Sequence, residues 1–350
     1  MLLKDCCTFQ EGYVNPSKKE LKYFKNGTIN WIKATDLTNG FIYDTEDKIN
    51  EYGLNSCSNK TLFPINSIVI SKSGTIGNLG ILKCEAYGNR ATINIMVNDK
   101  IANPLYIYYV LLAKNEEIKN RAVGSIQKNL YISALETIEL PNSDRPTQDK
   151  IVEILSNIDN QIERNNKIAK RLQVLGSTIY SKNIKETSNF FAIDESKIKT
   201  GKQDANFATP NGRYKFFTCS EDSFLCDNYE FDGKNILIAG NGNFNVKFYD
   251  GKFNAYQRTY VIGDNDIYGN LYYTYSYNTQ SLFKGANGSI VKFITIGMLK
   301  DIQIPEFSKE INDILNNIVY ETNNIKQETD NLNQLKSKLL PLLINGQINI

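Results

Sequence analysis

Two long stretches of the chain place apolar residues at steps that alternate between four and three positions. This seven-residue period is typical of a helix whose apolar stripe packs along a second helix or a partner. The first stretch covers 146–185, and Pro146 suits its first turn. The stripe residues expected to bind a partner in this stretch are Ile151, Leu155, Ile158, Ile162 and Leu172.

A polar residue, Asn165, lies on the same stripe, which then continues through Ala169 and Ile179. A buried asparagine on a helix seam commonly fixes the pairing register at some cost in stability. The other interpretation is a solvated break in the stripe. The sequence favours neither of the two.

The second stretch covers 308–344. Ser308 is a plausible N-cap with Glu310 in the first turn, and we expect Pro341 and Gly346 to end the helix. About 36 residues at 1.5 Å per residue would span roughly 54 Å. The stripe residues expected to bind a partner here are Ile311, Leu315, Ile318, Ile325, Leu332 and Leu339.

The remaining chain is rich in aromatic and β-branched residues. Alternating runs such as SIVIS (67–71) and TINIMV (92–97) predict strands, and LYIYYVLLAK (105–114) predicts a buried helix. The pattern predicts an α+β protein with two β-rich mixed α/β domains. Its expected parts are a first domain at 1–145, a central helix at 146–185, a second domain at 186–307, a helix at 308–344 and a tail at 345–350.

The two β-rich parts repeat one another. Residues 123–141 read VGSIQKNLYISALETIELP, and 164 positions later residues 287–305 read NGSIVKFITIGMLKDIQIP. At an offset of 168, NSIVISKSG (66–74) matches KNILIAGNG (234–242), and Asn89-Arg90 aligns with Gln257-Arg258. The first part of each half shows no such alignment. The chain therefore contains two copies of one domain.

Composition excludes several classes of protein. A net charge of +2 with 22% charged residues is typical of a globular chain and not of a polybasic binder. The absence of histidine excludes histidine-dependent triads, His-containing zinc sites and His-based nucleases. Six cysteines without a C-x-x-C pair are expected to be reduced core residues of a cytoplasmic protein. We expect neither a signal peptide nor a membrane span.

Local motifs do not indicate catalysis. SKSGTIGNLG (71–80) lacks the Lys-Ser/Thr of a P-loop. NPLY (103–106) lacks the second proline of the amino-methyltransferase tetrapeptide that it superficially resembles. FDGK (231–234) and YDGK (249–252) contain the Asp-x-Lys of some nucleases without supporting carboxylates, and Asp-Gly is first a turn signal. No metal site is expected.

The repeated glycine loops and the strands beside them predict a binding surface. Arg, Asn and Gln make paired hydrogen bonds to base edges, and glycine allows close approach to phosphates. The alternative is that the glycines only form turns and the arginines form ion pairs with nearby carboxylates. Two similar surfaces on one rigid frame instead favour a protein that reads two DNA half-sites. The predicted DNA-binding residues are Lys33, Lys72, Ser73, Thr75, Asn78, Asn89, Arg90, Lys128, Lys215, Thr218, Asn241, Asn243, Lys247, Gln257, Arg258 and Lys292.

The whole chain resembles the specificity subunit of a type I restriction-modification system. In the first half, the resemblance lies in INWIKATDL (29–37), ISKSGTIGNLG (70–80) and LPNSDRPTQDKIVEILSNIDNQIERNNKIAKRLQVL (140–175). In the second half, it lies in YKFFTCSE (214–221), DGKFNAYQRTYVI (250–262) and KLLPLLINGQINI (338–350).

This resemblance implies two target-recognition domains related by pseudo-twofold symmetry, with the long helices packing as an antiparallel coiled coil. It implies a non-catalytic subunit that binds double-stranded DNA, each domain reading one half of a bipartite target. The implied protein partners are two methyltransferase subunits and restriction-translocation subunits. No cofactor is expected on this chain, and S-adenosylmethionine would bind the methyltransferase partners. The alternative is a non-catalytic coiled-coil adaptor whose two β-rich domains bind protein.

Overall fold

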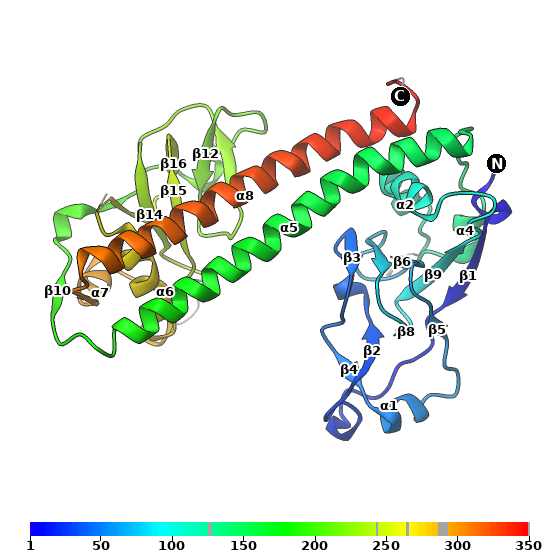
Figure 1. Cartoon of the computed structure of the whole chain (residues 1–350), viewed down its shortest axis with the longest axis horizontal. Helices are drawn as coiled ribbons and strands as arrows, with labels where there is room; N and C mark the ends of the chain where they lie inside the picture. Colours follow the sequence, from blue (N-terminus) through cyan, green and yellow to red (C-terminus); the bar gives the residue numbers. More distant parts are fainter. Residues whose placement is uncertain (125–127, 243, 264–265, 286–292, 349–350) are drawn as a thin grey trace. The chain divides into compact units, whose positions relative to one another are not determined.

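The computed structural model describes the chain except residues 125–127, 243, 264–265, 286–292 and 349–350, and also leaves the side chains of 280–285 undescribed. The chain forms two compact units (Figure 1). Unit 1 comprises Met1–Gln161 and Leu332–Ile350, and unit 2 comprises Ile162–Asn331. The boundaries fall inside the long helices α5 (Arg145–Asn183) and α8 (Lys309–Ile344), so each unit contains a part of both helices.

Unit 1 contains two sheets. The five-stranded sheet has the order β1 (Cys7–Glu11), β9 (Thr92–Val97), β6 (Ile68–Ser71), β7 (Leu79–Leu82) and β3 (Gly40–Ile42). The four-stranded sheet has the order β4 (Lys48–Ile49), β2 (Ile29–Ile32), β8 (Ala86–Gly88) and β5 (Leu62–Phe63). The helices of this unit besides α5 and α8 are α1 (Glu51–Asn55), α2 (Pro104–Ala113), α3 (Asn115–Asn120), α4 (Ile132–Glu136) and the 3-10 turns Leu3–Asp5, Leu21–Tyr23 and Ala34–Asp36.

Helix α2 is the buried helix predicted from the run of apolar residues, and residues 106–111 are all inaccessible to solvent. It packs against β7 and β9 of the five-stranded sheet. Its start explains the NPLY tetrapeptide: the side chain of Asn103 accepts a hydrogen bond from the Leu105 amide at 2.9 Å, and Pro104 occupies the first turn. This is an ordinary helix start, because Asn is a favoured N-cap and Pro suits position N1.

Unit 2 also contains sheets with one long and several short helices. The four-stranded sheet has the order β11 (Ile198–Thr200), β17 (Thr259–Gly263), β14 (Lys234–Ala239) and β15 (Val246–Asp250). The smaller sheets are β13 (Phe224–Cys226), β12 (Tyr214–Phe217) and β16 (Phe253–Ala255), and the pair β10 (Phe190–Ala192) and β18 (Gln303–Pro305). The other helices are α6 (Tyr268–Gly285), α7 (Ile296–Lys300) and the 3-10 turns Glu195–Lys197 and Ala205–Phe207.

The repeat read from the sequence is present in the strand registers of the two units. In unit 1, Ile68 of β6 lies opposite Ile81 and Ile95. In unit 2, Ile236 of β14 lies opposite Phe248 and Ile262. Each unit therefore places the strand before its glycine loop between two antiparallel neighbours. The α+β fold with two β-rich parts and two long helices is confirmed.

Two details of the expected alignment are wrong. The Lys72 amide donates to the Ala91 carbonyl at 2.7 Å, and the Gly240 amide donates to that of Arg258 at 2.8 Å. Arg258 therefore stands where Ala91 stands, and the counterpart of Arg90 is Gln257. The pairing differs because the second unit has one residue fewer between β14 and β17.

The first parts of the two halves do correspond in structure, although their sequences show no match. The Gly12 amide donates to the Thr92 carbonyl at 3.0 Å, and the Gly201 amide donates to that of Thr259 at 3.1 Å. A Cβ atom at either glycine would lie 2.1 Å from a neighbouring carbonyl oxygen. Both positions require a close backbone approach that only glycine allows. The glycine is therefore the single residue that the two segments need to share in sequence.

The long helices pack antiparallel within each unit (Figure 1). In unit 1, Lys336 of α8 pairs with Asp159 of α5 at 2.6 Å, and Tyr109 donates a hydrogen bond to the same carboxylate at 2.8 Å. In unit 2, the ring of Tyr180 lies 5.7 Å from that of Phe307, just before α8 begins. Further along the same two helices, Asn166 and Lys326 line one pocket.

Most residues of the two stripes expected to bind a partner pack within the chain itself. Ile151 and Leu155 are buried in the core of unit 1, and Leu315 and Ile318 are buried in the core of unit 2. Leu172 and Ile311 pack on the core of unit 2 and Leu339 on that of unit 1, while Ile158, Ile162, Ile325 and Leu332 are half-buried. Assigning the buried members to an external partner is wrong, because each unit's own sheet and helices already cover them. Asn165 is 3% exposed, so the solvated-break interpretation is also wrong.

The C-terminal end of α8 differs from expectation at Pro341, which lies inside the helix. A proline in the last turns removes a single backbone hydrogen bond, and here the helix continues to Ile344. Gly346, with φ +67°, ends it: the Gln347 amide donates to the Leu342 carbonyl at 2.9 Å and the Gly346 amide to that of Leu343 at 3.2 Å. This is the Schellman pattern of helix termination.

All six cysteines are free; Cys6, Cys7 and Cys226 are buried and the other three are half-buried. Among the residues that the structure describes, no helix is long and apolar enough to cross a membrane.

We predict that Leu155→Ala lowers the free energy of unfolding of unit 1 by about 2–5 kcal/mol, because it leaves a cavity at a fully buried position. Trp31, the one tryptophan of the chain, is buried in unit 1, so its fluorescence during urea unfolding reports on this unit. The matched control is Leu335→Ala on α8, where the side chain is 45% exposed and the expected change is within about 0.5 kcal/mol. Equal effects of the two variants would contradict the core assignment.

Candidate nucleic-acid interface

Five loops of unit 1 meet at one place, which we call loop cluster 1 and define as residues 11–15, 33–37, 72–78, 89–91 and 128–130. Backbone hydrogen bonds hold them together. The Asn89 amide donates to the Ile32 carbonyl at 2.9 Å, and the Leu130 amide donates to the Lys72 carbonyl at 2.8 Å. The sequence-predicted residues of the first half therefore do lie in one region of the unit.

The two asparagines of loop cluster 1 that were predicted to bind DNA serve the loops themselves. Asn89 donates to Asn15 at 2.6 Å and accepts from the Ala91 amide at 2.9 Å. Asn78 donates to the Leu37 carbonyl at 3.2 Å. These asparagines act as internal braces, since their hydrogen-bonding capacity is directed at neighbouring loops.

Two of the predicted lysines are neutralised locally. Lys72 pairs with Glu11 at 3.0 Å, and Lys33 pairs with Asp47 at 2.8 Å and Glu46 at 3.1 Å. Burial works to lower the pKa of Lys33, but the hydrogen bonds to Asp47 and Glu46 outweigh it and raise the pKa. Such lysines set the loop geometry and offer little uncompensated charge to a phosphate.

Arg90 and Lys128 differ from these lysines. Both are exposed, and within the described part of the chain neither side chain makes a hydrogen bond or an ion pair. Thr75 is exposed and Ser73 half-buried on either side of Gly74, whose φ is +75° and whose surroundings are open. The free basic groups of loop cluster 1 therefore flank an open glycine tip.

Unit 2 builds the same frame, which we call loop cluster 2 and define as residues 201–204, 217–221, 240–242, 244–245, 256–258 and 293–294. The Tyr256 amide donates to the Phe217 carbonyl at 2.9 Å, and the Ile294 amide donates to that of Gly240 at 3.0 Å. These two bonds are the counterparts of the two that hold loop cluster 1. Asn243 and Lys292, both predicted to bind DNA, lie outside the described residues.

Here too several predicted side chains turn inward. Lys247 donates to the carbonyl of Thr218 at 3.1 Å and to that of Ser220, and Thr218 is buried. Burial lowers the pKa of Lys247 to about 8. Gln257 donates to Asp204 at 3.0 Å. Predicting Lys247 as a phosphate contact is wrong, because its ammonium is desolvated and held by main-chain oxygens.

Other predicted residues of unit 2 have different positions. Lys215 pairs with Asp330 of α8 at 3.2 Å, which places it on the helix side of the unit. Asn241 is half-buried, and its backbone forms an isolated antiparallel β-bridge with Phe293.

The guanidinium of Arg258, which is exposed, lies 5.8 Å from the centroid of the Phe293 ring. The other basic side chain of loop cluster 2, Lys202, is exposed but pairs with Glu230. Arg258 is thus the exposed basic side chain of this cluster that makes no ion pair with a described residue.

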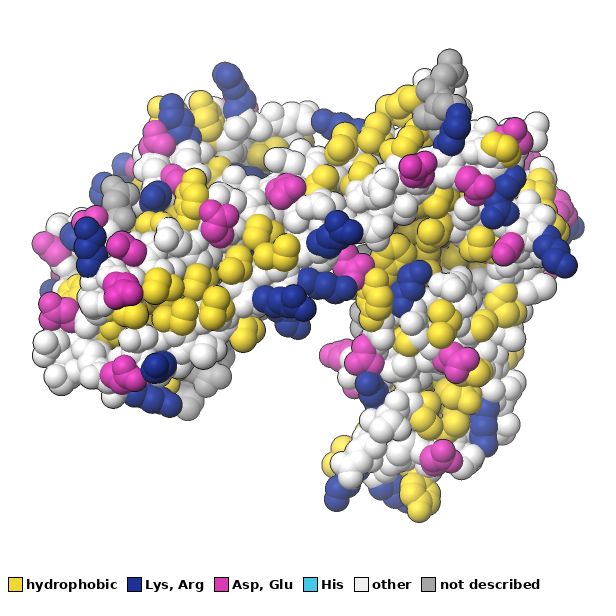
Figure 2. All heavy atoms as spheres, viewed as in Figure 1, with side chains coloured by type: hydrophobic (Ala, Val, Ile, Leu, Met, Phe, Trp, Pro, Cys, Tyr) yellow, Lys and Arg dark blue, Asp and Glu magenta, His cyan; other side chains and the backbone are white. Residues whose placement is uncertain are grey.

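The charge distribution agrees with this accounting. Figure 2 shows basic and acidic side chains interspersed over the visible face instead of gathered in one basic field.

The two Asp-Gly pairs of unit 2 are turns. Gly233 and Gly251 have φ values of +82° and +136°, which supports the turn interpretation, although neither pair joins two strands of one hairpin. No group of three or more Cys, Asp or Glu able to hold a metal occurs among the described residues.

A scan against protein-family models matches residues 1–174 to the type I restriction modification DNA specificity domain. The match confirms the resemblance seen in the sequence and covers the whole of loop cluster 1.

Curated relatives extend the likeness. The chain is 43% identical over 109 residues to the specificity subunit of the type I restriction enzyme EcoDI from Escherichia coli, covering 31% of this chain and 24% of that protein. It is 30% identical over 174 residues to the MjaIX specificity subunit from Methanocaldococcus jannaschii, covering 48% and 40%. The matches therefore span less than half the length of either relative.

A solved structure matches the full chain. The S subunit of a type I restriction-modification system from M. genitalium superposes with a TM-score of 0.66, at 17% identity, over 98% of this chain and 95% of that one. At this identity the comparison shows a shared fold. The two-unit architecture with long helices is therefore shared with that S subunit.

Lys247 allows a test of the inward orientation in loop cluster 2. Its folded-state pKa of about 8 lies below the ordinary 10.5, so the unfolded chain binds more protons between these pH values. We therefore predict that the stability of the wild type relative to Lys247→Met rises as the pH increases from 8 toward 10. Thermal unfolding of both proteins across this range measures the difference, and parallel curves would show that Lys247 is solvated.

Proposed function

We propose that this chain is the DNA-recognition subunit of a type I restriction-modification complex. The observation that carries the proposal is one loop frame built twice, with its first copy inside a DNA specificity domain. In this proposal each loop cluster reads one half of a bipartite target. The subunit has no catalytic step of its own.

The proposed assembly contains two methyltransferase subunits docked on the long helices, together with restriction-translocation subunits. The relatives in the comparisons are named as specificity subunits of type I restriction enzymes, which supports this assignment. S-adenosylmethionine would bind the methyltransferase partners, and this chain would bind no cofactor. A mapping of modified bases in a host genome, with and without this chain, tests the proposal: a two-part motif that vanishes on deletion is the expected result.

The residues proposed to touch DNA are those left uncommitted by the loop frames. Arg90 and Arg258 can form bidentate hydrogen bonds to a guanine edge, each contributing about 1–3 kcal/mol of discrimination. Lys128 would contact phosphate, which orients the complex without reading sequence. The braces Asn78 and Asn89 position these groups and make no contact with bases.

We predict that Arg90→Ala relaxes recognition of one half-site and Arg258→Ala of the other, each by about tenfold or more. The matched controls, Lys100→Ala and Lys309→Ala, remove exposed charges outside the loop clusters and should leave both half-sites intact. The measurement is the affinity of the assembled methyltransferase complex for duplexes with one altered half-site. If an arginine variant discriminated like the wild type, that arginine would have no reading role.

The same assay separates the proposal from a protein-binding adaptor. A DNA complex held through phosphates loses affinity steeply as salt rises, whereas an adaptor shows no salt-dependent DNA affinity.

The long helices lead to a second prediction about spacing. Inserting one heptad in α5 between Gln161 and Ile162, and one in α8 between Asn331 and Leu332, keeps the stripe in phase at the unit boundaries. Seven residues add about 10.5 Å at 1.5 Å each, close to three base pairs at 3.4 Å. The gap between the half-sites should lengthen by about three base pairs while both half-sites stay the same. An unchanged gap in the modified-base map would show that the helices do not set the spacing.

A further inference from the structure

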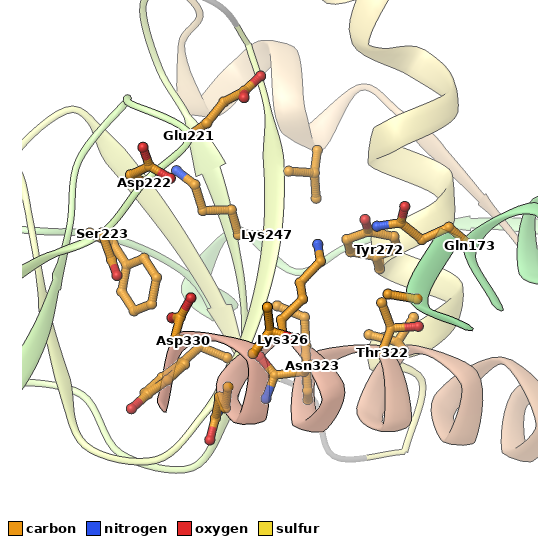
Figure 3. Close-up of a pocket in the computed structure, with 18 of the residues that line it drawn as sticks. Gln173, Glu221, Asp222, Ser223, Lys247, Tyr272, Thr322, Asn323, Lys326 and Asp330 are labelled. Carbon is orange, nitrogen blue, oxygen red and sulfur yellow. The ribbon is translucent and has the colours of Figure 1, made fainter. Parts of the chain in front are cut away.

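Unit 2 contains a pocket that Arg258, the residue proposed to read DNA, does not line. It encloses about 350 Å³ between β12, β15, α6 and the unit's portions of α5 and α8 (Figure 3). Gln173, Lys247, Tyr272, Asn323 and Lys326 are among the residues that line it. A volume of this size is typical of sites for small molecules.

The corresponding place in unit 1 is filled by a buried ion pair. Asp159 and Lys336, whose side chains are 13% and 14% exposed, pair at 2.6 Å. The offset of 164 in the repeat aligns Asp159 with Asn323 and Lys336 with Leu172. The same offset aligns the buried Ile151 and Leu155 with Leu315 and Val319, which are also buried. Unit 2 has therefore lost both charges of the pair at this position.

Two hydrogen-bond donors of the pocket have no acceptor. Asn323 is only 8% exposed, and its Nδ2 makes no hydrogen bond. Lys326 lies three residues further along α8 and is exposed at the pocket, and its ammonium makes no hydrogen bond or ion pair within the described residues. Figure 3 shows the Lys326 side chain rising from α8 into the pocket, between Lys247 and Tyr272. A buried donor without a partner is destabilising, so an acceptor that reaches Asn323 Nδ2 would be favourable.

The other basic groups of the pocket are already engaged. Lys215 pairs with Asp330 at 3.2 Å, and Lys247 donates to main-chain carbonyls. Desolvation lowers the pKa of Lys326 and outweighs the attraction of Asp330, which raises it. Lys326 is therefore the lining lysine that has neither a hydrogen bond nor an ion pair within the described residues.

The rim and walls of the pocket restrict the ligand further. Glu221 and Asp222 are exposed at the lining and would repel a DNA backbone or an acidic peptide carrying several negative charges. Val319, Phe248 and Tyr272 provide apolar surface. The complementary ligand carries one negative charge and a compact apolar ring.

We propose that this pocket binds a small aromatic carboxylate, with its carboxylate on Lys326 and Asn323 and its ring against the apolar wall. The pocket shares Phe217 and Glu221 with loop cluster 2. Arg258, the residue proposed to read DNA, does not line it, so this inference does not depend on DNA recognition.

The test uses the full-length chain with benzoate as the probe and benzamide as its neutral isostere, titrated by ligand-observed NMR. Benzoate should bind, and benzamide should bind at least about tenfold more weakly, because only the carboxylate forms charge-assisted hydrogen bonds. Lys326→Gln should weaken benzoate binding at least about tenfold, and so should Asn323→Asp, which places a like charge at the site. Lys338→Gln, an exposed lysine on α8 in unit 1, is the matched control and should bind benzoate as the wild type does.

Circular dichroism melts confirm that each variant is folded before titration. Equal binding of benzoate and benzamide would overturn the proposal, as would unchanged benzoate binding by Lys326→Gln. Failure of the wild type to bind either probe would also overturn it and would favour a side chain of a protein partner as the occupant.

Discussion

The burial of the apolar stripes of α5 and α8 is the constraint on which both units depend. Leu155 and Ile151 close the core of unit 1, and Leu315 and Val319 close that of unit 2. The five-stranded sheet of unit 1 and the four-stranded sheet of unit 2 each share a core with short helices and with residues of α5 and α8. Because the stripes are used in this way, a partner that docks on the helices must use their outward faces. Ile168, Val174 and Leu175 of α5 are exposed on such a face.

The repeat preserves backbone geometry more strictly than side chains. Matching amide-to-carbonyl bonds hold both loop clusters, and Gly12 and Gly201 allow the same close approach in each. Backbone hydrogen bonds depend little on residue identity, so the frame survives while the exposed loop residues change. That combination suits a protein whose two domains share a scaffold and read different sequences. It also explains how the Asp159–Lys336 pair of unit 1 could give way to a pocket in unit 2 without loss of the fold.

Charge is used sparingly on the loop clusters. Carboxylates match Lys33, Lys72 and Lys202, and carbonyl oxygens hold Lys247. The exposed cations without a partner among the described residues are Arg90, Lys128 and Arg258. A chain with net charge +2 can then contact DNA at few points. In the proposed complex, the methyltransferase partners would supply much of the remaining phosphate contact, and this chain would supply discrimination.

The sequence by itself determined the elements and their duplication, because hydrophobic periodicity and repeated motifs are local properties. The long helices, the strands at 68–71 and 92–97, and the buried helix after Asn103 all followed from such patterns. Only the tertiary structure decided that Gln257 in unit 2 is the counterpart of Arg90 in unit 1 and that Lys247 points inward. It also decided that the apolar stripes of the long helices pack in the cores of the units. Each of these depends on which distant carboxylate, carbonyl or apolar side chain lies opposite. No spacing along the chain records that, since the partners come from separate loops and helices that folding brings together.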